Sequence, residues 1–177
     1  DGIEISCIDN GMPVVVLRAE DMGISGYESP AELNANEVLK SKLQSIRLQI
    51  GPKMNLGDVE GAAVPKMCMI SPPLKDGICN TRTFIPYKCH SAIGVLGAVS
   101  AATAAIIPGT VAEGIATVPA GASKTLSVEH PSGEFSINLH VDEQADPPQV
   151  LKAGLLRTAR LLSRGELYVP EHIFINE

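Results

Sequence analysis

The feature that most constrains the fold is a long uncharged segment in the middle of the chain. No Asp, Glu, Lys or Arg occurs from Cys89 to Ile107, and Pro108-Gly109 follows directly. A helix that is apolar all round is typically buried on every side. Sixteen helical residues would span about 24 Å, the thickness of a small domain. We therefore expect a central apolar helix over about residues 90–107, wrapped by strands.

The same run could instead cross a membrane. Its most apolar part, Ala92 to Ile107, has 16 residues, whereas a spanning helix needs roughly 20. Its Ala, Gly, Ser and Thr content also lowers its hydrophobicity. The buried helix is favoured, and we expect no membrane association.

A second helix is indicated over about residues 30–50. Ser29-Pro30-Ala31-Glu32 has the form of a capping box with Pro at the first helical position. Asn34 and Glu37 repeat the three-residue offset, which allows a restart there. An apolar stripe then runs down one face, formed by Leu39, Leu43, Ile46 and Ile50, and Gly51-Pro52 ends it. This pattern predicts an amphipathic surface helix.

The remaining apolar segments favour strands, so the fold class is α+β with a single domain over 1–177. Alternation and turn signals place them at Ile3–Asp9, Val14–Leu17, Lys66–Ile70, Ile78–Ile85, Ile115–Val118, Lys124–His130, Glu134–Val141 and Leu167–Val169. The leucines of Val150–Leu162 fit a helix and a strand about equally. Within Ile78–Ile85, alternation puts Asn80 and Arg82 on one face.

Composition excludes several classes of protein. Fourteen Lys and Arg against twenty Asp and Glu give a net charge of −6, and aromatics are 3%, which argues against nucleic-acid binding. The four cysteines have no C-x-x-C spacing, so we expect no metal site and a reducing, cytoplasmic environment. The N-terminus has no signal-peptide pattern. A start at Asp1 fits the C-terminal part of a longer protein or a processed chain.

The start of the predicted central helix is a candidate anion site. The first N–H groups of a helix lack partners and carry the positive end of its dipole, and here they would belong to Cys89, His90 and Ser91. A carboxylate would satisfy them, and the Cys89 thiol would have a lowered pKa, suited to a proton carrier or nucleophile. Alternatively, Ser91 or water caps the helix and Cys89 is a small buried apolar residue.

Three further sites have both a binding and a structural interpretation. Arg82 is suited to hold a carboxylate ligand, or it forms an internal ion pair. The Asn10-Gly11-Met12 turn and the Ser132-Gly133 turn could present N–H groups to a ligand, or they are plain turns. No phosphate-loop, zincin or serine-hydrolase motif occurs.

Six ordered segments resemble the PrpF family, which includes methylaconitate isomerase and 4-oxalomesaconate tautomerase and has a diaminopimelate-epimerase-like fold. They are Ile8–Leu17, Gly51–Val59, Thr81–Pro86, Cys89–Val95, Glu129–Gly133 and Leu156–Arg160. The resemblance covers nearly the whole chain but only the C-terminal half of the family. It implies two similar halves, each a curved, mostly antiparallel sheet around a central helix, with the active site between them.

Two departures separate this chain from the related amino-acid epimerases. Those enzymes follow the helix-start Cys with Gly-Thr-Gly, whereas Cys89 is followed by His90-Ser91-Ala92. Their Gly-Asn-Pro-His turn is replaced by Gly11-Met12-Pro13-Val14. Epimerisation is therefore disfavoured relative to the PrpF interpretation.

The reaction that the resemblance implies is a cofactor-free 1,3-proton shift that moves a C=C bond in an unsaturated tricarboxylate or oxo-tricarboxylate. Such a shift needs a base, an acid and fixed donors for the dienolate charge. The Lys and Cys thought to transfer the proton lie in the absent N-terminal half. Substrate-anchoring roles then fall to Asn10, Gly11, Met12, Asn55, Arg82, His90, Ser91, Ser132 and Gly133, with Cys89 as a candidate catalytic residue. A homodimer is compatible with this interpretation. The alternative function is a non-catalytic carboxylate-binding or dimerisation module on the same fold.

Overall fold

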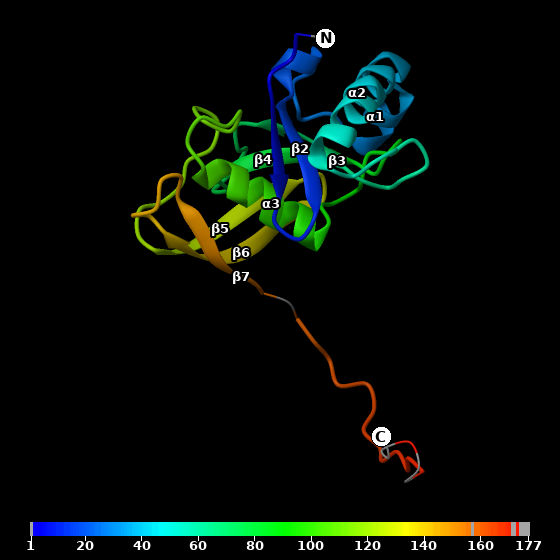
Figure 1. Ribbon diagram of the computed structural model, residues 1–177, viewed down its shortest axis with the longest axis vertical. Helices are drawn as coiled ribbons and strands as arrows, with labels where there is room; N and C mark the ends of the chain where they lie inside the picture. The colour runs from blue at the N-terminus through cyan, green and yellow to red at the C-terminus, as the bar shows by residue number, and fades with distance from the viewer. Residues whose placement is uncertain (1, 157, 171–172, 174–177) are drawn as a thin grey trace.

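The computed structural model describes residues 2–156, 158–170 and 173, and its strands form one sheet in chain order. The strands are β1 (Ile5–Asp9), β2 (Pro13–Arg18), β3 (Lys66–Ser71), β4 (Cys79–Phe84), β5 (Ser123–His130), β6 (Gly133–Asp142) and β7 (Gln149–Leu155). The β2–β3 and β4–β5 pairs are parallel, and the others are antiparallel. The sheet curls around α3 (Val95–Ile106), as Figure 1 shows. The expected α+β class, mostly antiparallel sheet and central helix are confirmed.

Helix α3 is buried along most of its length because small residues let the strands approach it closely. Residues 97–104 are all buried, and they face apolar side chains of β2, β5 and β6 such as Val14, Leu126 and Ile137. Its polar side chains find internal partners, since Ser100 Oγ donates to the Met12 carbonyl at 2.8 Å. Within the described ranges, no helix is long and apolar enough to cross a membrane.

The opposite face of β2–β4 is covered by α1 (Pro30–Ala35) and α2 (Glu37–Ile50). The capping box at Ser29 is present. A new helix, α2, begins at Glu37, close to the restart that the sequence allowed. Its N-cap is Asn36, whose Oδ1 accepts the Leu39 N–H at 3.0 Å. Leu39 and Leu43 are buried against the sheet. The predicted helix over 30–50 is therefore a pair of helices, and short 3-10 turns at Glu20–Met22 and Pro52–Met54 flank the pair.

Two predicted strands are wrong. Ile115–Val118 forms a turn and loop after α3, joined to the sheet end by a single bond from Thr117 N–H to the Ile78 carbonyl at 3.2 Å. Leu167–Val169 lies in extended chain that leads away from the sheet (Figure 1). An apolar run becomes a strand only where another strand pairs with it. The ambiguous Val150–Leu162 segment contains β7 and then irregular chain, with residue 157 outside the described residues.

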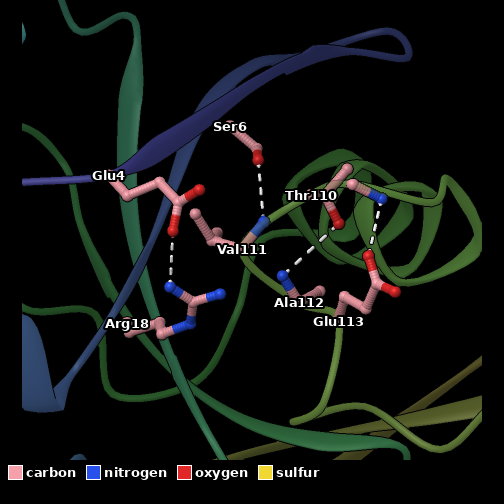
Figure 2. A network of polar contacts seen from close by, with 8 residues as sticks. Glu4, Ser6, Arg18, Thr110, Val111, Ala112 and Glu113 are labelled. Atoms are coloured by element: carbon pink, nitrogen blue, oxygen red, sulfur yellow. Dashed lines mark hydrogen bonds and ion pairs between the residues drawn. The ribbon is translucent and has the colours of Figure 1, made fainter.

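The segment after α3 is tied to the edge of the sheet by a small polar network. Ser6 Oγ on β1 accepts the Val111 N–H at 3.0 Å, and the Glu113 carboxylate accepts the Gly109 N–H at 2.8 Å (Figure 2). Thr110 Oγ1 also donates to a carbonyl in the last turns of α3 at 2.7 Å. These bonds hold the C-terminal end of the central helix in place.

Candidate functional site

The loop before α3 corrects the expected anion site. The helix begins at Val95 with Gly94 as its N-cap, so Cys89, His90 and Ser91 precede it in a loop. Two of their N–H groups already have protein partners. Cys89 N–H donates to Asn34 Oδ1 at 2.8 Å, and His90 N–H donates to a carbonyl of β4 at 2.8 Å. The prediction that Cys89–Ser91 supply free helix N–H groups is therefore wrong.

The physical reason is that this loop continues the sheet before it enters the helix. Cys89 forms an antiparallel bridge with Phe84 at the end of β4. His90 then closes a local turn, in which its Nδ1 accepts the Ala92 N–H at 2.9 Å. These contacts use the backbone in an extended and turned form, so helical geometry starts only at Val95. The side chain of Ser91 is exposed and does not cap the helix.

The Cys89 thiol faces the layer between the sheet and α2, away from α3. It is 7% exposed and belongs to the apolar cluster that contains Phe84 and Met67. Burial raises its pKa to about 11, and the nearby Arg82 guanidinium opposes this shift only partly. The expected lowering of the Cys89 pKa is wrong, because the thiol lies in an apolar layer instead of at a helix start. Its environment is that of the small buried apolar residue considered above.

A pocket of about 610 Å³ opens where the first part of β4, the β5–β6 turn and the loop after β3 meet. Its walls carry cationic, anionic and amide side chains in close proximity. The polar residues that line it are Lys75, Asp76, Asn80, Arg82, Glu129, His130, Ser132 and Glu134, together with Gly133. Of the residues predicted to anchor substrate, Arg82, Ser132 and Gly133 therefore meet here.

Arg82 is a fixed cation at the wall of this pocket. It is 5% exposed, its Nε donates to the Glu28 carbonyl at 2.7 Å, and its Nη1 donates to Asn80 Oδ1 at 3.0 Å. Among the described residues, Nη2 has no acceptor and no carboxylate pairs with the guanidinium. Burial lowers the Arg82 pKa, but a guanidinium keeps its charge at neutral pH. The alternative of an internal ion pair is not found in this part of the chain.

Glu129 organises another wall of the pocket, although it was not among the predicted site residues. Its carboxylate accepts three backbone N–H groups, from Leu74 at 2.7 Å, Lys75 at 2.7 Å and Gly77 at 3.2 Å. A Cβ at Gly77 would lie 2.6 Å from Glu129 Cγ, so only glycine allows this approach. Glu129 pairs in register with Asn80 on β4. Parallel pairing of segments far apart in sequence brings them together, and no local pattern signals it.

His130 and Ser132 form the turn between β5 and β6. His130 Nδ1 accepts the Ser132 N–H at 3.3 Å. Burial lowers the pKa of His130, a backbone hydrogen bond to Glu134 opposes this shift, and the nearby Arg82 guanidinium lowers the pKa further. His130 is therefore mostly uncharged at neutral pH, and its ring lies against the backbone of Glu134 at the pocket wall. His90 and Ser91, also predicted to anchor substrate, are not among the residues that line this pocket.

The other predicted residues do not line this pocket. Asn10 turns towards α3, where its Nδ2 donates to Thr103 Oγ1 at 3.0 Å. Gly11 has a φ of 81° and packs near Leu96, and Met12 lines a separate apolar hollow of about 220 Å³ at the start of α3. Asn55 is exposed beyond α2 in the left-handed conformation.

The described residues contain no group of three or more His, Cys, Asp and Glu side chains arranged to hold a metal ion. Their polar groups are suited instead to hydrogen bonds and to charge pairing with an anion. Arg82, a buried cation at the pocket wall with no acceptor for its Nη2 among the described residues, is suited to bind a carboxylate.

Comparison with known proteins agrees with the geometry. Residues 1–170 match the family model described as PrpF protein. The chain is 53% identical over 165 residues to 4-oxalomesaconate tautomerase of Pseudomonas putida, covering 93% of this chain and 45% of that protein. It is also 53% identical over 169 residues to (4E)-oxalomesaconate Delta-isomerase of a Novosphingobium species, covering 96% of this chain and 46% of that protein. The chain thus spans about half the length of these curated relatives.

A solved structure shares the fold. The crystal structure of methylitaconate-delta-isomerase superposes with a TM-score of 0.79 at 22% identity, covering 98% of this chain and 48% of that one. At this identity the likeness concerns the fold alone. The family match extends over nearly the full chain, so this chain belongs to the PrpF family.

Proposed function

We propose that this chain is the C-terminal half of a cofactor-independent isomerase that moves a C=C bond by 1,3-proton transfer in an unsaturated tricarboxylate. The observation that carries the proposal is Arg82, a buried cation whose Nη2 has no acceptor in the described part of the chain and which lines an open pocket. Two relatives at 53% identity that bear the name of oxalomesaconate support this substrate class.

In this proposal the chain binds and orients the substrate. Arg82 is suited to hold one carboxylate through its unpaired Nη2, because a guanidinium bond to a carboxylate is charge-assisted. His130, which lines the pocket, is proposed to lie next to an oxygen that gains charge in the dienolate. Ser132 and Gly133 add the polar edge of the β5–β6 turn. His90 and Ser91, in the loop before α3, complete the set proposed to contact substrate.

The proton-transfer groups are proposed to lie in the other half of the protein. With a pKa of about 11, Cys89 stays protonated at neutral pH and is a poor base. A base with a pKa near the working pH is needed to abstract a proton next to a carboxylate or carbonyl. The missing half is therefore the proposed partner that closes the cleft over the pocket.

The test is turnover by the full-length protein that contains this chain. We expect it to consume 4-oxalomesaconate, followed by the change in conjugated-diene absorbance, in preference to 2-methylaconitate. Arg82→Met should lower kcat/KM about 100-fold, since a lost charge-assisted bond is worth about 2–3 kcal/mol. Arg18→Met is the matched control, because Arg18 pairs with the exposed Glu4 and does not line the pocket, and its effect should stay within about twofold.

Different outcomes would contradict the role of Arg82 and the isomerase proposal. A loss of twofold or less in Arg82→Met would remove the anchoring role of Arg82. Binding of the tricarboxylate without turnover by the intact protein would contradict the isomerase proposal and favour a carboxylate-binding module.

A further inference from the structure

Lys75 is a second cation at the pocket wall, and it comes from a different element than Arg82. Lys75 lies in the turn between β3 and β4, whereas Arg82 lies within β4. No carboxylate pairs with the Lys75 ammonium among the residues that the structure describes. A ligand in this pocket therefore meets two cations that approach from separate walls.

The turn that carries Lys75 is held by the buried carboxylate of Glu129. Glu129 is 5% exposed and accepts the N–H groups of Leu74, Lys75 and Gly77. Glu129 lines the pocket, but its carboxylate oxygens already accept these three N–H groups of the turn. The carboxylate thus fixes the backbone from which the Lys75 side chain extends.

We propose that Lys75 is a specificity-determining residue that binds a substrate carboxylate separate from the one bound by Arg82. Glu129 is the positioning residue that holds Lys75 in place. This inference rests on the proposed function and narrows it, because it assigns the recognition of an additional carboxylate to one side chain. In this proposal Arg82 and the β5–β6 turn take up the two carboxylates that a dicarboxylate also carries, and Lys75 takes up the third carboxylate of a tricarboxylate.

The experiment compares two probes that differ by one carboxylate, tricarballylate and glutarate, by calorimetric titration of the full-length protein. The wild type should prefer tricarballylate, and Lys75→Met should reduce that preference about tenfold, the range of one charge-assisted contact. Lys42→Met is the matched control, because Lys42 lines a different groove beside α2. It should leave the preference unchanged.

For the Glu129→Gln variant, a pure charge effect and a positioning role predict opposite changes in trianion binding. On charge alone, Glu129→Gln should strengthen the binding of a trianion, whereas loss of the held turn should weaken it. We expect a fall in the tricarballylate preference of about threefold, the range of one weakened hydrogen bond. Glu134→Gln removes another carboxylate at the pocket edge, and within the described residues Glu134 makes no bond to the β3–β4 turn that carries Lys75. The preference of this variant for tricarballylate should therefore stay the same or rise.

A double variant decides whether Glu129 acts through Lys75. Glu129→Gln added to Lys75→Met should reduce the preference no further, since residues acting as one unit are non-additive. Independent, multiplying losses would overturn the positioning role. An unchanged preference in Lys75→Met, or no preference in the wild type, would overturn the role of Lys75. Failure of the proposed function would instead appear as absence of 4-oxalomesaconate turnover in the wild type, whatever these ratios are.

Discussion

The reactivity of Cys89 distinguishes a buried thiol from an activated one. With a pKa of about 11, Cys89 is ionised to roughly 0.1% at pH 8, whereas a thiol with the ordinary pKa of about 8.5 is ionised to roughly 25%. Because the thiolate is the nucleophile, this alone slows alkylation about 250-fold. The 7% exposure of the residue slows it further.

The assay is iodoacetamide alkylation of the folded chain between pH 7 and 10, with each cysteine peptide quantified by mass spectrometry. The Cys89 rate should rise about tenfold per pH unit without levelling, since the pH remains below its pKa. Exposed Cys7 is the internal reference, and in urea all four thiols should level near pH 8.5. Arg82→Met should slow Cys89 further, because Arg82 lowers its pKa. A Cys89 rate that levels below pH 9 in the folded chain would refute this reasoning.

Three stability predictions are checked by urea unfolding. Arg47 is fully buried and donates to carbonyls between residues 59 and 64, so Arg47→Met should cost about 3–5 kcal/mol, and a loss below about 1 kcal/mol would contradict it. Gly77→Ala should cost about 1–3 kcal/mol, since the added Cβ would lie 2.6 Å from Glu129 Cγ. Its control, Gly61→Ala, has open space around the added Cβ and should change stability by less than about 0.5 kcal/mol. Ser71→Ala should raise stability by about 1 kcal/mol, because the Ser71 hydroxyl is buried with no partner among the described residues; a loss would show that it is satisfied.

The elements that local patterns specify were predictable. The capping box at Ser29 and the stripe through Leu39 and Leu43 placed the surface helices, because capping and periodicity act within a few residues. The hairpin of β5 and β6 followed from alternation around a Pro-Ser-Gly turn. Residues 167–169 have the same kind of apolar pattern without a partner strand, which is why that strand was predicted and is not formed.

The pocket was only partly predictable. Placing Asn80 and Arg82 on one face followed from the twofold period of a strand, and their bond at 3.0 Å agrees with it. Glu129 and Lys75 could not be placed, because their contact depends on the turn after β3 reaching the end of β5. The chain positions that meet there are separated by 54 residues.

The sequence by itself determined that an apolar helix lies at the centre of an α+β fold, because an uncharged run of that length can be stable in water only when it is covered. Tertiary structure alone decided where that helix begins, which face receives the Cys89 thiol, and which charged side chains share a pocket. Those outcomes depend on strand pairing and on backbone hydrogen bonds between distant segments. Such bonds form only when the whole sheet closes, so no local stretch of residues encodes them.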